Sequence, residues 1–260
     1  MEKVFKYSNK SIIFSIILVL ISLIISISIG AAEISIDEII GILLREFLGY
    51  HSNAEINNIN KIIVLEWRLP RFCLGFLVGA SLAIAGCGFQ GVFKNPLADP
   101  FLLGSAAGAG LGVTLVIVND LNYSFGIINS VQLGAFIGAL GAVICAAFIS
   151  ISAGKSIASL LLAGIATAAF LTACQTYLMH KYYSSMQEIY SWIIGRLLTS
   201  GWEDVITILP YFTVCFIIIF LFRKELDLLR LSEDEAKMLG GNPRRTYFIV
   251  LTAASLLTAV

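Results

Sequence analysis

Charged residues are scarce in this chain of 260 residues, where Asp, Glu, Lys and Arg together make up only 13%. Apolar residues make up 58% and the mean hydropathy is +0.90, which is more apolar surface than a soluble domain of this length can bury. Lipid must therefore solvate much of the chain. The 17 basic residues balance the 17 acidic ones, so no excess of positive charge points to a nucleic acid.

The residue types that build metal and catalytic sites are also few. His51 and His180 stand far apart and form no HExxH pattern. The five cysteines lie within apolar runs without a CxxC pair, which indicates small buried residues and not a disulfide or metal site: Cys73, Cys87, Cys145, Cys174 and Cys215. Residues 154–156 spell the end of a P-loop, but Ile149 stands where that pattern needs glycine. We expect no catalytic residue and no metal ligand in this chain.

Long runs without charge predict membrane-spanning helices, because about 20 helical residues cross about 30 Å of hydrocarbon. Seven runs are free of charge: 11–32, 72–93, 101–119, 121–154, 156–180, 205–222 and 246–260. The fourth is too long for one helix, and its polar first third predicts a loop before a helix from Ser130. The last has only 15 residues and is too short to cross unaided. The predicted fold is an all-α, polytopic transmembrane helix bundle with about six full spans and a partial seventh.

The distribution of basic residues predicts the orientation of these spans. A cytoplasmic N-terminus places eleven of the 17 lysines and arginines on the cytoplasmic side. The positive-inside rule prefers this orientation. The first run, behind three lysines, lacks a small-residue cleavage site after it and is expected to be a span and not a signal peptide.

Small residues recur at every fourth position in three runs, which predicts close helix packing or, alternatively, the lining of a substrate path. The three sets are Gly75, Gly79, Ala83, Cys87 and Gly91; Gly104, Gly108 and Gly112; and Gly134, Gly138 and Ala142. The polar residues at depth are Gln90, Gln132 and Gln175, and none is ionisable. An ion-coupled carrier usually keeps Asp, Glu or His within its spans, so we expect the driving energy to come from elsewhere.

Two arginines flank the predicted start of the second span, where Pro70 suits a first helical turn. Arg68 and Arg71 lie one turn apart, and each guanidinium group can bind a carboxylate of an acidic partner. The alternative is a pair of interfacial anchors. At the other end of this span, Pro96 and Pro100 forbid a continuous helix and predict a rigid turn.

The segment 223–245 is the largest charged stretch and predicts a short helix with both ends marked. Ser232 with Glu235 forms a capping box, and Gly240 supplies the C-terminal stop. This helix is suited to bind a soluble partner subunit, or it is simply a solvated loop helix. On the opposite side, Trp192 and its aromatic neighbours predict an interfacial belt or a gate.

Taken together, these motifs resemble the FecCD family of ABC-transporter permeases, the membrane subunits that import ferric siderophores, haem and vitamin B12. The strongest are RLPR at 68–71, the small-residue run 79–90, NPLADP at 95–100, and the glycines Gly104 and Gly108. WxxG at 192–195 and EAxxLG at 235–240 are weaker supports. The resemblance implies a single permease domain over 1–260 with a cytoplasmic coupling loop at 223–245. Family members have ten spans, so this chain would stop within the seventh.

The resemblance also implies roles for individual residues. Arg68 and Arg71 would accept glutamates of an extracytoplasmic substrate-binding protein. The helix seated on a separate ATPase would involve Ser232, Glu233, Asp234, Glu235, Ala236, Leu239 and Gly240. The translocation path or its gate would involve Gln90, Asn95, Pro96, Gln175, Trp192 and Gly195. Arg196 stands where the family usually has a small residue, and a cation there would favour an anionic ferric chelate.

The implied function is that of a permease subunit in the cell membrane, paired with a second permease copy or paralogue in a dimer. ATP and Mg would be bound by the partner ATPase, and this chain would carry no cofactor. Ferric siderophore is the expected substrate, with haem or cobalamin as the alternative. A carrier that works without ATP, or an intramembrane enzyme, are the competing classes.

Overall fold

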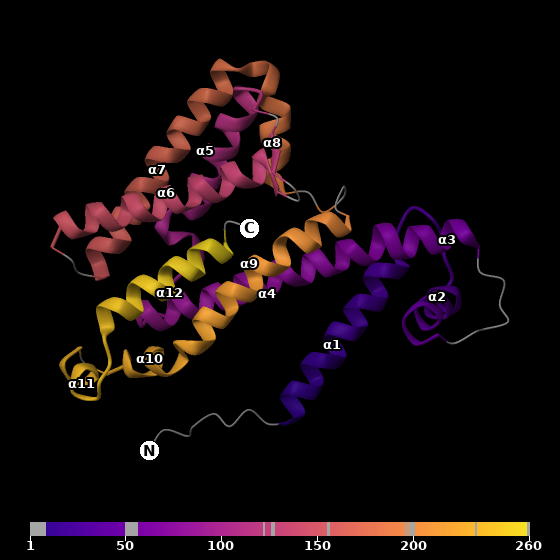
Figure 1. Ribbon diagram of the computed structural model, residues 1–260, viewed down its shortest axis with the longest axis horizontal. Helices are drawn as coiled ribbons and strands as arrows, with labels where there is room; N and C mark the ends of the chain where they lie inside the picture. The colour runs from indigo at the N-terminus through magenta and orange to yellow at the C-terminus, as the bar shows by residue number, and fades with distance from the viewer. Residues whose placement is uncertain are drawn as a thin grey trace. The chain divides into compact units, whose positions relative to one another are not determined.

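The computed structural model describes residues 9–49, 57–121, 123–125, 128–154, 157–195, 197, 201–231 and 233–258. Within them the fold is an assembly of helices, which confirms the predicted all-α class (Figure 1). The α-helices are α1 (Asn9–Ser28), α2 (Ile36–Leu48), α3 (Asn58–Ile62), α4 (Leu69–Phe93), α5 (Ser105–Val118), α6 (Ser130–Ser152), α7 (Ile157–Lys181), α8 (Met186–Ile194), α9 (Trp202–Leu221), α10 (Arg223–Leu228), α11 (Glu233–Met238) and α12 (Pro243–Leu257). Shorter elements are the π-helix η1 (Ile63–Arg68) and the 3-10 helices η2 (Pro100–Leu103) and η3 (Tyr183–Ser185).

Five helices among the described residues are long and apolar enough to cross a membrane: Lys10–Ser28, Asn58–Phe93, Ser130–Ser152, Ala158–Lys181 and Trp202–Leu221. They agree with five of the charge-free runs. The run 101–119 instead opens with η2 and continues as α5, whose 14 residues span about 21 Å at 1.5 Å per residue. The 15 residues of α12 are similarly short. The chain is a multi-pass membrane protein.

The prediction that Pro70 begins the second span is wrong. The helix begins at Asn58 and passes through η1 into α4 without a break, giving 36 helical residues. In the π register the Leu69 N–H donates to the carbonyl of Val64, five residues earlier. Pro70 has no N–H for the next carbonyl, that of Leu65, and the indole Nε1 of Trp202 donates to this oxygen at 3.0 Å. Proline is accommodated because another side chain replaces its missing donor.

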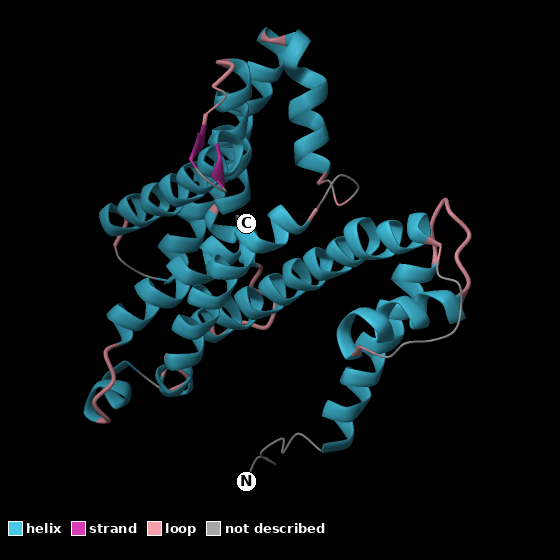
Figure 2. Ribbon diagram, turned by 45° about the vertical axis from the view of Figure 1, so that its right-hand side comes forward, coloured by secondary structure: helices cyan, strands magenta, loops and turns pink. Residues whose placement is uncertain are grey.

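Two local elements were not expected. The amphipathic helix α2 begins after Ser35, whose hydroxyl accepts the Glu38 N–H, and ends at Gly49, whose φ of 65° is left-handed. The segment predicted as a loop before α6 contains a tight hairpin of β1 (Ser124–Phe125) and β2 (Ile128–Asn129), visible as the magenta arrows in Figure 2. The predicted helix start at Ser130 is confirmed.

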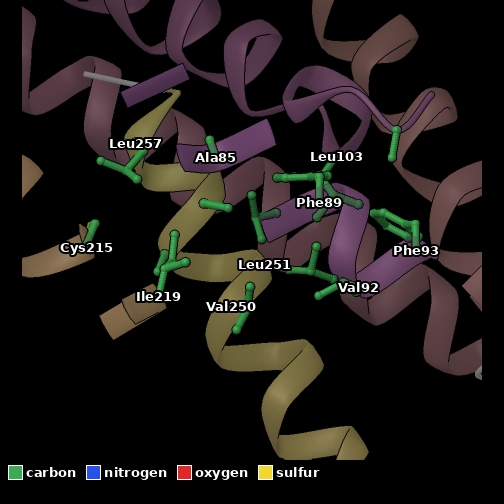
Figure 3. Packing of buried hydrophobic residues seen from close by; sticks show 14 of the residues in the cluster. Ala85, Phe89, Val92, Phe93, Leu103, Cys215, Ile219, Val250, Leu251 and Leu257 are labelled. Atoms are coloured by element: carbon green, nitrogen blue, oxygen red, sulfur yellow. The ribbon is translucent and has the colours of Figure 1, made fainter. Parts of the chain in front are cut away.

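By its internal contacts the chain divides into two compact units, Met1–Gly75 with Leu197–Trp202, and Phe76–Arg196 with Glu203–Val260. The core of the first unit consists of Ile27, Ile34, Ile39, Ile42, Val64 and Leu69. The main core of the second unit joins α4, α9 and α12, with Phe89 and Val250 fully buried (Figure 3). The single domain expected over 1–260 stays a prediction.

Within the second unit, glycines let α5 and α6 approach until their backbones touch. A Cβ atom added at Gly108 would overlap the Gly138 carbonyl oxygen, and one added at Gly112 would overlap that of Gly134. Helices in lipid gain little from apolar contact alone, so this close approach is a principal source of their association. The small-residue sets of these two helices therefore serve packing.

We expect Gly138→Ala to destabilise the α5–α6 pair, because its new Cβ atom would strike the backbone of Gly108. The cost should be about 1–3 kcal/mol, as is usual for overpacking. Gly141→Ala is the matched control on the same helix, since a Cβ atom there meets nothing within 4 Å. Thermal unfolding of both variants in detergent measures the difference, and equal stability would contradict the packing role.

Candidate functional site

Arg68 lies buried at the end of η1, with 7% of its surface exposed. Its guanidinium group donates to the carbonyl oxygens of Ile27 and Ala32, and to that of Ser28 at 3.2 Å. These carbonyls lie at and just beyond the C-terminal end of α1, where backbone oxygens have no helical partner and carry partial negative charge. Arg68 therefore caps α1 and fixes the corner that leads to α2.

A glycine makes room for this guanidinium group. A Cβ atom at Gly30 would lie 2.6 Å from Nη2 of Arg68 and 2.8 Å from its Cζ. The guanidinium group of Arg68 fills the space that a side chain at position 30 would need, so Arg68 can be buried here only because residue 30 is glycine. The sequence carried no sign of this pairing, since Gly30 lies 38 positions before Arg68.

Arg71 is only partly buried, one turn further along α4. The two arginines predicted to act alike thus have different surroundings. Arg68 can meet an external carboxylate only by giving up its bonds to α1, whereas part of Arg71 remains at the surface. The docking role predicted for the pair remains a prediction.

The other end of α4 carries the predicted turn. Gln90, Asn95 and Pro96 are all exposed. The Asn95 side chain accepts the Leu97 N–H at 2.9 Å, and Asp99 accepts the Phe101 N–H at 2.7 Å, so two side-chain turns fix this segment. The polar and proline residues of NPLADP thus have local structural roles.

Lys94 links this turn to the charged loop, which the sequence did not indicate. It ends α4 in a left-handed conformation with φ of 51°, uncommon for a residue with a side chain. Its Nζ donates to the carbonyl oxygen of Leu231 at 2.8 Å, 137 positions away. The loop that precedes α11 is therefore attached to the end of α4.

The segment 223–245 forms two short helices, α10 and α11, where one was predicted. Ala236 of α11 is buried, and its carbonyl accepts the Gly241 N–H at 2.8 Å. The predicted stop is confirmed at Gly240, whose φ is 85°. Asp234 pairs with Lys237 at 3.4 Å, while Glu235 is exposed.

The tip of α11 is apolar and faces outward. Met238 is 87% exposed and the adjacent Leu239 is 63% exposed. Glu233 begins this helix. Ser232, and with it the predicted capping box, lies outside the described residues, as does Arg196.

Two of the residues predicted to line the path or its gate, Gln175 and Trp192, are packed against α5. Gln175 of α7 is buried, and its Nε2 donates at 3.2 Å to Oγ1 of Thr114, which in turn donates to the Gly110 carbonyl at 2.7 Å. A Cβ atom at Gly110 would lie 2.8 Å from the Gln175 amide, so this glycine makes room for it. This hydrogen-bonded arrangement joins α5 to α7.

Trp192 and Gly195 lie at the end of α8. The Trp192 ring is partly buried and packs on a small cluster of α5 and α6 that includes Val113 and Ala139. Gly195 ends the helix with φ of 85°, and its N–H donates to the Trp192 carbonyl at 3.0 Å.

Gln132, the remaining glutamine, forms a capping box with Asn129 at the start of α6. Among the described residues no group of three or more His, Cys, Asp or Glu could hold a metal ion.

We expect Arg68→Ala to destabilise the first unit by about 1–3 kcal/mol, because it leaves the buried Ile27 carbonyl without its donor. Arg45→Ala is the control, since this exposed arginine belongs to the same unit. Thermal unfolding in detergent compares the two. A smaller loss for Arg68→Ala than for Arg45→Ala would show that the cap is not needed.

Comparison with known proteins identifies a family for this chain and several relatives. Residues 18–260 match the FecCD transport family. The Fe(3+)-citrate import system permease protein YfmE of Bacillus subtilis (strain 168) is 35% identical over 248 residues, which cover 95% of this chain and 70% of the relative. The cobalamin import system permease protein BtuC of Halobacterium salinarum is 36% identical over 200 residues, covering 76% of this chain and 53% of that protein.

A solved structure supports the assignment at the level of the fold. An ABC transporter assigned to the metal-chelate type, in an inward-facing conformation, superposes with a TM-score of 0.78 at 25% identity and covers 97% of this chain and 75% of its own. The matched region includes both ends of α4, the α5–α6 pair and the loop with α11. The chain belongs to the FecCD family of ABC-transporter permeases.

Proposed function

We propose that this chain is the membrane-spanning permease subunit of an ATP-driven importer for a ferric siderophore. An extracytoplasmic binding protein delivers the chelate, and a separate ATPase subunit, which binds ATP and Mg, drives its passage. A second permease copy or paralogue completes a dimer. The observation that carries this proposal is the family match over residues 18–260. The iron-citrate permease among the relatives supports an iron chelate, and the cobalamin permease supports the alternative, haem or cobalamin.

The orientation we propose has a cytoplasmic N-terminus. It places the turn after α4 and the loop carrying α10 and α11 on the cytoplasmic side, together with most lysines and arginines. The Arg68 end of the long helix then lies outside. Each end of this helix therefore faces the partner that the proposal requires there.

The proposed mechanism uses α11 to transmit motion. Ala236 holds this helix to the permease through a buried face, and the exposed Met238 and Leu239 form an apolar tip for a pocket on the ATPase. Lys94 attaches the start of the loop to the end of α4. ATP binding in the partner moves α11, and the packed helices behind it alternate between outward and inward opening.

Reconstitution tests the proposal directly. The full chain, its ATPase and its binding protein are placed in liposomes, and uptake of a radioactive ferric siderophore is followed with and without ATP. We expect uptake that requires ATP and all subunits. Uptake by the chain alone under an ion gradient would instead support the competing class, a carrier that works without ATP.

We expect Arg71→Glu to weaken docking of the binding protein about tenfold or more, because it replaces an attractive charge pair with a repulsive one. Binding to the permease in nanodiscs at low and physiological salt measures the effect and its salt dependence. Arg45→Glu, a charge reversal at an exposed arginine of the same unit, is the control. Equal affinities for the two variants would contradict the role of Arg71.

We expect the double change Met238→Asp with Leu239→Asp to abolish most ATPase association while leaving the permease folded, because both side chains are exposed. Charging an apolar contact removes its favourable burial. The matched control is Tyr183→Asp, which is 75% exposed in the connection between α7 and α8. Co-purification of the ATPase and its stimulated activity are the measurements, and unchanged association would refute this contact.

A further inference from the structure

The amphipathic helix α2 presents an apolar face that no described residue of its own unit covers. Ile39 and Ile42 are each 1% exposed and belong to the core of the first unit. Four other apolar residues recur at helical spacing along another side and are exposed: Ile36, Ile40, Leu44 and Phe47. Phe47, the largest of them, is 67% exposed.

The rotation of α2 about its axis is fixed by polar contacts that flank its buried isoleucines. Glu46 pairs with Lys61 of α3 at 2.8 Å, and Glu38 accepts two bonds from Nδ2 of Asn60 at 2.9 and 3.0 Å. Arg45 is exposed and lies away from the apolar face. Because these contacts and the buried isoleucines hold the same side of α2 against the unit, the apolar face cannot turn inward.

The place of α2 in the chain puts this face at the membrane boundary. It begins eight positions after α1 ends at Ser28, and Arg68 holds the intervening corner against the end of η1. The span α1 is itself almost uncovered by the described residues, with 6% of its apolar window buried, which is the exposure expected of a helix that faces lipid. In Figure 1 α2 is seen nearly end-on while α1 is seen from the side, so α2 runs across the end of the span.

We propose that α2 lies in the plane of the membrane interface, with Ile36, Ile40, Leu44 and Phe47 inserted among the phospholipid acyl chains and Arg45 directed to water. A short helix with an apolar face and a charged face is stable in this position. The apolar face carries no charge for an acidic or basic protein partner, and it continues the lipid-exposed surface of α1. The interface helix anchors the corner that Arg68 fixes.

Spin labels placed on single cysteines test the proposal in liposomes. The labels replace Ile40, Phe47 or Arg45 in a chain whose five native cysteines are changed to alanine, and whose elution as a single folded species is checked first. We expect labels at 40 and 47 to collide with oxygen several-fold more than with a water-soluble nickel chelate, and the label at 45 to show the reverse. Water-like values at 40 and 47 would overturn the proposal, and so would protection from both reagents, which would mean that protein covers the face.

A second measurement uses the unaltered chain. A phospholipid with a diazirine in its acyl chain is photoactivated, and labelled peptides are mapped by mass spectrometry. We expect label on α1 and on the apolar residues of α2. Label on α1 without label on 36–48 would overturn the proposal, even if the cysteine-free variants failed to fold.

Discussion

The fold depends on the rule that backbone polar groups surrounded by lipid must find partners within the protein. The region around Arg68 shows how one chain meets this rule where a helix ends and where another contains proline. The guanidinium group of Arg68 satisfies carbonyls at the end of α1, and the indole of Trp202 satisfies the Leu65 carbonyl that Pro70 leaves open. Two residues with the appearance of a surface motif, arginine and proline, are thus parts of one hydrogen-bonded corner.

In the second unit the helices must associate in a solvent where apolar contact between them contributes little free energy. Glycines let α5 and α6 touch, and buried polar pairs join neighbouring helices. Gln175 bonds to Thr114 between α7 and α5, and Ser150 lies 3.2 Å from Ser159 between α6 and α7. Polar residues at depth therefore need not mark a transport path, since these four are already partnered inside the bundle.

Runs without charge were sufficient to predict five of the spans, because a helix in lipid needs a long apolar run and its ends need charge or turn residues. The turn at Pro96 and the stop at Gly240 were predictable for the same local reason. The failures concern long-range partners. Pro70 was read as a helix start because no local signal shows that Trp202, 132 positions later, replaces its donor. The contact between Gly30 and Arg68 could likewise not be predicted from their spacing in the sequence.

The sequence allowed candidate site residues to be selected by their type, but it did not predict their surroundings in the folded chain. RLPR drew attention to two arginines, and the structure gives them separate environments, since Arg68 is buried and caps α1 while Arg71 is only partly buried. The family match rests on likeness in sequence, and the structure shows what one of the two arginines does within the chain. A buried cation held by three carbonyls has its partners already, so the observed role of Arg68 is that of a cap on α1. The first residue of the motif thus contributes to the stability of the fold.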